Sequence, residues 1–169
     1  MWSMDEIKDA AGSKFLVAVT YGSYTPEGTK SRIPKLARRG DKILENVAGK
    51  YRIAQKQKPK NERPLGTTDF VSAQALFYVG VAMGIHDVIR MSIKQWEYFF
   101  ESAIGYPTKH IMRYVSEVVE ALTGAIEINS GYETACAFVE DNVITPIANE
   151  VFVDTDEILR VSRQKLLFY

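Results

Sequence analysis

The chain has 169 residues, of which 46% are hydrophobic and 25% are charged, and its 21 basic residues balance its 21 acidic ones. This composition is that of an ordinary globular protein, and it argues against disorder, collagen and coiled-coil rods. Cys136 is the single cysteine, which excludes an intramolecular disulfide and favours a reducing compartment. The first residues lack the basic and apolar regions of a signal peptide, so we expect an intracellular or virion protein.

The N-terminal residues carry a clear helix-start signal. Ser3 followed by Glu6 is a capping box, which predicts a short helix over residues 3–11 that ends at Gly12. An apolar run over residues 15–21 comes next, and its periodicity does not separate a strand from a helix. We therefore expect at most one short strand, located in this run.

A long amphipathic helix is predicted over residues 34–57. Pro34 suits its first turn, and apolar residues then recur at steps of three and four. Gly49 makes a break in this helix plausible. A polar linker with two prolines is expected over residues 57–67, between the basic N-terminal helical region and an apolar helical core.

The most apolar segment runs from Phe70 to Ile85, 16 residues without a charge. This is just shorter than the roughly 17–25 residues that a membrane-spanning helix needs. We interpret it as a buried core helix, capped by Thr68 or Asp69, and expect no membrane insertion.

The C-terminal half contains four further helix-start signals, each a polar residue that can cap the helix behind it. The whole chain, residues 1–169, is thus predicted to be a single all-α domain, a compact bundle of about six or seven helices. The start signals are Ser92, Thr108, the pair Ser130 and Glu133, and the pair Asp154 and Glu157.

The zero net charge hides a strong segregation. Residues 30–63 contain twelve basic and three acidic residues, a net charge of +9, and the rest of the chain has 9 basic and 18 acidic residues, a net charge of −9. A basic surface of this kind attracts phosphate backbones and binds them less tightly as salt rises. Tyr51 is the only aromatic residue in the segment, so we expect backbone contacts rather than base stacking. The candidate nucleic-acid contacts are Arg32, Lys35, Arg38, Arg39, Lys42, Lys50, Arg52, Lys56, Lys58 and Lys60.

Two apolar clusters are candidate contacts between copies of the chain. Neighbouring residues on a helix point about 100° apart, so one stripe cannot bury every aromatic residue of the first cluster. The second cluster lies at the C-terminus, where chains usually fray. Ordinary core packing is the competing interpretation. The candidate contacts are Trp96, Phe99, Phe100, Leu167, Phe168 and Tyr169.

The residues that could carry catalysis or hold a ligand form no recognisable signature. The segment from Gly22 to Ser31 departs from the P-loop spacing, because five residues separate its glycines and Thr29 precedes Lys30. The two histidines, His86 and His110, are too far apart for a helical metal-binding pair. The sequence predicts no metal site and no cofactor.

These observations favour a non-enzymatic helical assembly subunit that binds the backbone of DNA or RNA and forms a homo-oligomer. One alternative is an adaptor or structural subunit whose basic segment docks an acidic protein. Another is a small helical enzyme that uses His86 or His110 as an acid or base.

Overall fold

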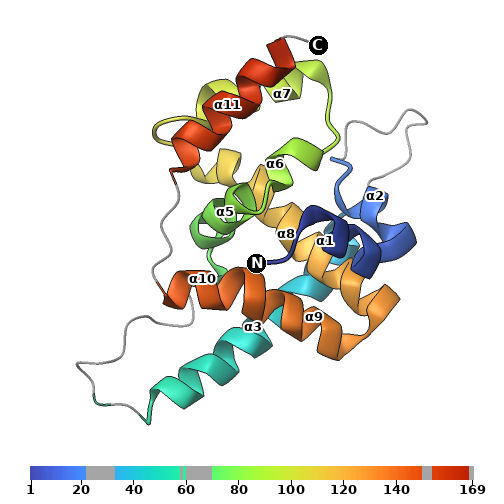
Figure 1. Ribbon diagram of the computed structural model, residues 1–169, viewed down its shortest axis with the longest axis vertical. Helices are drawn as coiled ribbons and strands as arrows, with labels where there is room; N and C mark the ends of the chain where they lie inside the picture. Colours follow the sequence, from blue (N-terminus) through green and yellow to red (C-terminus); the bar gives the residue numbers. More distant parts are fainter. Residues whose placement is uncertain (22–32, 58, 60–69, 150–153, 168–169) are drawn as a thin grey trace.

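The computed structural model describes residues 1–21, 33–57, 59, 70–149 and 154–167, and in these ranges the chain is built from α-helices (Figure 1). The expected all-α fold is confirmed. The apolar run near residue 15 forms a short helix, α2 (Phe15–Ala18), instead of a strand. In the part of the chain that is described, the only β-type pairing is an isolated parallel bridge between Thr20 and Arg90.

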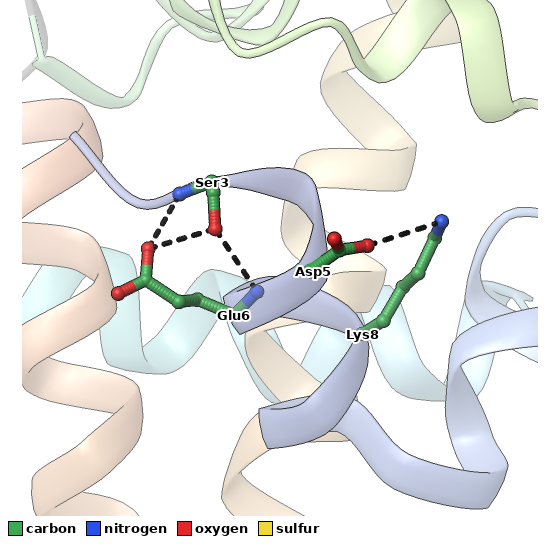
Figure 2. A network of polar contacts seen from close by, with 4 residues as sticks. All are labelled: Ser3, Asp5, Glu6 and Lys8. Carbon is green, nitrogen blue, oxygen red and sulfur yellow. Dashed lines mark hydrogen bonds and ion pairs between the residues drawn. The ribbon is translucent and has the colours of Figure 1, made fainter.

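Helix α1 (Met4–Ala11) begins with the capping box that the sequence predicts (Figure 2). The Ser3 amide donates to Oε2 of Glu6 at 2.7 Å, and the Glu6 amide donates to Oγ of Ser3 at 3.2 Å. An ion pair of 3.7 Å joins Asp5 to Lys8 on the same helix. Local hydrogen bonds thus satisfy amides that a helix start otherwise leaves unpaired.

The end of α1 packs against Asn129, a residue far away in the sequence. Gly12 ends the helix with a φ of 55°, and a one-turn 3-10 helix, η1 (Gly12–Lys14), follows. A Cβ on Gly12 would lie 2.4 Å from Oδ1 of Asn129. The Asn129 side chain donates to the carbonyl oxygen of Ala10 at 3.0 Å. A side chain would therefore be strained at position 12 and would also clash there.

Two long helices, α3 (Ile33–Gln55) and α8 (Lys109–Ser130), pass across each other within the molecule (Figure 1). Helix α8 contacts α1, α2, α3, α5, α6, α7 and α9, so it forms the centre of the core. Helix α3 is continuous through Gly49, and no break occurs there. Its buried side chains follow the predicted stripe, including Leu36, Ile43 and Val47.

The apolar segment that follows residue 70 is divided into two helices. Helix α5 (Ala73–Ala82) is capped by Ser72, whose Oγ accepts from the backbone at 3.1 Å, and Gly84 at φ 80° separates it from α6 (Ile85–Val88). The predicted caps Thr68 and Asp69 lie outside the described residues. No helix within those residues is long and apolar enough to cross a membrane. The expected linker over 57–67 also lies largely outside them.

Three more helix starts are as predicted. Ser92 caps α7 (Ile93–Ala103), and Thr108 caps α8. Asp154 accepts a hydrogen bond of 3.0 Å from the backbone at the start of α11 (Thr155–Leu167). Each cap acts over three residues, which explains why the sequence alone locates these starts.

The second predicted capping box, Ser130 with Glu133, does not form. Ser130 is the last residue of α8, and its hydroxyl donates to the carbonyl oxygen of Ala10 at 2.7 Å. Because Ser130 is still part of α8, Gly131 takes the N-cap position of the next helix, without a side-chain cap. Helices α9 (Tyr132–Val139), η3 (Glu140–Ile144, a π-helical turn) and α10 (Thr145–Ala148) follow.

Two aromatic residues of α7 are buried inside the chain, which corrects part of the expected interface. Phe99 and Phe100 have exposed fractions of 0% and 2%, so they are unavailable to a second copy. Trp96 is half-buried and stacks on Phe100 with ring centroids 5.2 Å apart. Tyr98 of the same helix is 48% exposed, so packing within the chain covers only part of this aromatic cluster. The side chains of Leu167, Phe168 and Tyr169 lie outside the described residues.

Candidate active site

Helices α3 and α8 approach each other through glycine on both sides. A Cβ built on Gly40 would lie 1.8 Å from the carbonyl oxygen of Glu120, and one on Gly124 would lie 2.3 Å from the carbonyl oxygen of Leu36. Real Cβ atoms do not come this close to backbone atoms, so only glycine permits the crossing. The contact places Asp41, the residue after Gly40, beside the backbone of Glu120.

Three carboxylates therefore meet at the crossing, and we call them the acidic cluster: Asp41 of α3 with Glu117 and Glu120 of α8. Glu117 and Glu120 are three residues apart and so share one side of α8. The pKa of Glu120 is raised from its ordinary 4.5 to about 7, first by burial and then by the negative charges of Asp41 and Glu117. At neutral pH Glu120 is thus divided between its acid and its carboxylate, a property suited to proton transfer.

A cation and a tyrosine adjoin the cluster. Arg113 lies one turn before Glu117 on α8, is exposed, and lowers the pKa of Glu120. Tyr21 stacks on Tyr114 with ring centroids 4.6 Å apart and ring planes 6° from parallel. Burial, followed by the charge of Glu117, raises the pKa of Tyr21 to about 12. Tyr21 therefore stays protonated next to the acidic cluster.

Three of the predicted basic contacts lie on the first half of α3, the helix that carries Asp41. Lys35, Arg38 and Lys42 are exposed and follow each other at steps of three and four residues, so they share one side of the helix. We call these three cations the basic stripe. It places positive charge on the same helix as one member of the acidic cluster.

The remaining basic candidates are placed differently. Arg39 does not belong to the stripe, because its side chain forms an ion pair with Glu127 of α8. Lys50 and Arg52 are exposed on the second half of α3, and Lys56 is exposed just after its end. The described ranges do not include Arg32, Lys58 or Lys60.

Carboxylate oxygens are the donors that Mg²⁺ prefers. Where the structure describes the chain, however, no group of three or more acidic, histidine or cysteine side chains is placed to hold one ion together. Mg²⁺ is commonly held by only one or two carboxylates together with waters and substrate phosphates, and the reaction described below is written for the protein side chains alone.

Of the two histidines, one is buried and the other packs at the surface against an aromatic ring. His86 is 1% exposed, and its Nε2 lies 2.9 Å from Oγ of Ser162, so substrate cannot reach this pair. His110 is exposed, and its ring meets the edge of Tyr114 at 5.7 Å between centroids. The alternative of a histidine-based enzyme therefore receives no support from the geometry.

The acidic cluster is not among the sites predicted from the sequence. Gly40 lies on the buried side of α3, and Asp41 is one of only three acids in the basic segment over residues 30–63. The available signal was a pair of glycines on amphipathic helices: Asp41 directly follows Gly40, and Glu120 lies one turn before Gly124. Their partnership depends on a contact between two distant segments, which periodicity does not reveal.

No curated protein sequence matches this chain. Two solved structures with a similar fold are both of the nuclease domain of ribonuclease III from Campylobacter jejuni. The first is 19% identical with a TM-score of 0.60 and covers 84% of this chain and 97% of its own. The second, described as showing structural flexibility in a region involved in dimer formation, is 18% identical with a TM-score of 0.60 and covers 83% and 98%. At this identity the likeness establishes a shared fold.

A family model described as ribonuclease-III-like matches residues 13–147, which is most of the chain. The matched region contains α3, α8 and all three acids of the cluster. This match overturns our prediction of a non-enzymatic assembly subunit, because the family is that of a nuclease. The chain belongs to the ribonuclease-III-like family.

Proposed function

We propose that this chain is a ribonuclease that hydrolyses the RNA backbone at the crossing of α3 and α8. The observation that carries the proposal is the position of Glu120, which lies within the region matched by the family model. Burial, together with the charges of Asp41 and Glu117, raises its pKa to about 7. A carboxylate with a pKa near the working pH is an effective general base.

In the proposed reaction, the Glu120 carboxylate accepts a proton from a water molecule as that water attacks the phosphorus. A new phosphorus–oxygen bond forms, the bond to the leaving nucleotide oxygen breaks, and that oxygen takes a proton from solvent. Asp41 and Glu117 keep the proton affinity of Glu120 high enough for this transfer. Arg113 supplies an exposed positive charge against which the phosphate can be held.

The test is cleavage of an end-labelled RNA by the purified chain in a buffer that contains magnesium chloride. We expect cleavage by the wild-type chain and slower cleavage by Asp41→Asn, because removing this charge lowers the pKa of the general base Glu120. Glu97→Gln is the matched control, since Glu97 is an exposed acid of α7 outside the cluster. Cleavage that persists unchanged in Asp41→Asn, or is equally slowed in Glu97→Gln, would exclude this site.

The basic stripe is proposed to hold the RNA backbone. Replacing Lys35, Arg38 and Lys42 by glutamine is expected to weaken RNA binding and to flatten its salt dependence, because each phosphate contact contributes a slope of about 0.7 to 0.9 in log K against log salt. The measurement is fluorescence anisotropy with labelled RNA between 50 and 200 mM salt, roughly the range over which counterion release is most visible. A triple variant with an unchanged slope would place the RNA elsewhere.

The expected homo-oligomer stays a proposal, supported by the description of dimer formation in the second Campylobacter jejuni structure. Trp96 remains a candidate contact because it is half-buried. Light scattering of the purified chain tests for the homo-oligomer. The molar mass of a monomer at all protein concentrations would count against it.

A further inference from the structure

Helix α11 lies outside residues 13–147, the region that the family model matches, and it rests against α5 and α7 (Figure 1). Leu159 is fully buried and Ser162 is 4% exposed, so these two residues mark the docked face. The reaction proposed above uses no residue of α11. The role of this helix is therefore a separate question.

His86 of α6 makes the most specific contact with this helix. Its ring is 1% exposed, and its Nε2 forms a hydrogen bond of 2.9 Å with Oγ of Ser162. Its Nδ1 is also buried and has no hydrogen-bond partner among the described residues. A neutral imidazole tolerates this arrangement, because an unprotonated Nδ1 is only an acceptor without a donor.

A protonated ring would not be tolerated. Imidazolium carries a hydrogen on both nitrogens, so the Nδ1 hydrogen would be a buried donor with no acceptor, on a buried positive charge. Two charged groups act on the ring. Asp87, half-exposed on the same helix, has its Oδ1 3.5 Å from Nε2 and favours protonation, whereas Lys165 of α11 opposes it.

The balance of these effects is unfavourable to the charged ring. Burial is the largest influence and lowers the pKa of His86 below its ordinary 6.5, Asp87 raises it and Lys165 lowers it further. Once α11 leaves, solvent reaches the ring and the ordinary pKa returns. Protons therefore bind more tightly to the undocked form than to the docked form.

We propose that His86 is a pH-sensitive latch that holds α11 on the α5–α7 face when neutral and releases it on protonation. The direction follows from linkage: the docked state is fully favoured above pH 6.5 and is weakened as the pH falls below that value. The release is local, since the remainder of the core packs around α8.

The test is hydrogen exchange of the full chain at pH 7.5 and pH 5.5, corrected for the intrinsic rate and followed by mass spectrometry. Peptides from α11 are expected to lose protection at the lower pH relative to peptides from α8, by up to about tenfold, which is the largest change that one pH unit below the ordinary pKa allows. His86→Gln, which stays neutral, is expected to lose this pH dependence. His110→Gln is the matched control, because His110 is an exposed histidine and its replacement leaves the loss of protection in place.

Two surface variants keep the test decisive if His86→Gln does not fold. Lys165→Gln removes a repelling charge and is expected to reduce the loss of protection at pH 5.5, whereas Asp87→Asn removes an attracting charge and is expected to increase it. These opposite shifts follow only from a charge that appears at His86. Equal protection of α11 at both pH values in the wild-type chain, or the same loss in all of these variants, would overturn the proposal.

Discussion

Alanine at Gly40 is expected to destabilise the chain by about 3 kcal/mol, whereas alanine at Gly49 of the same helix is expected to stabilise it by about 0.5–1 kcal/mol. A methyl group on Gly40 would stand 1.8 Å from the carbonyl oxygen of Glu120. The obstacle is a backbone atom, so no side-chain rotation relieves the clash and the two helices must move apart. At Gly49 a Cβ meets no heavy atom within 4 Å, and alanine gains only its higher helix propensity.

Urea unfolding, monitored by circular dichroism, measures the change in the free energy of unfolding for both variants. Gly124→Ala extends the test to α8, because its Cβ would stand 2.3 Å from the carbonyl oxygen of Leu36. We expect it to resemble Gly40→Ala. If Gly40→Ala and Gly49→Ala had the same midpoint, the close crossing of α3 and α8 would be wrong, and with it the position of Asp41 beside Glu120.

The sequence predicts helix starts well because their signals are local. Ser3, Ser92, Thr108 and Asp154 each accept a hydrogen bond from an amide three residues later, and a pattern of residue types at that spacing is enough to recognise them. Ser130 shows where this reasoning fails. Its residue type fits a cap, but α8 continues through Ser130, so the N-cap position of the next helix falls on Gly131.

The active site was not predicted because it depends on contacts between distant segments. Asp41 and Glu120 come from two helices that the sequence presents as separate amphipathic elements, and only the glycine contact between them brings the charges together. The excess of basic residues over residues 30–63 indicated a nucleic-acid-binding protein rather than an enzyme. The count of charges could not show that Arg39 is paired with Glu127 while Arg38 is exposed.

Replacing Glu120 by glutamine is expected to lower the rate of RNA cleavage by at least about a hundredfold, within the range of about 10²–10⁴ that general acid–base catalysis contributes. The wild-type rate is expected to rise with pH and level off above about 7, because only the carboxylate form of Glu120 accepts the proton. Glu120→Gln is expected to lose this rise. Rates are measured with RNA in excess between pH 5.5 and 8.5, with Glu97→Gln as the control.

The same substitution has an opposite expected effect on stability, which separates a catalytic role from a structural one. The folded-state pKa of Glu120, about 7, lies above its ordinary 4.5, so the protonated form favours folding and this contribution is lost as the pH rises from 4.5 through about 7. Above pH 7 the ionised Glu120 is a largely buried charge that Asp41 and Glu117 also repel, and glutamine removes both penalties. Glu120→Gln should therefore unfold at a higher temperature than the wild-type chain at pH 8 and at a similar temperature at pH 4.5. A variant that is slower but less stable at pH 8 would show that Glu120 supports the fold instead of the chemistry.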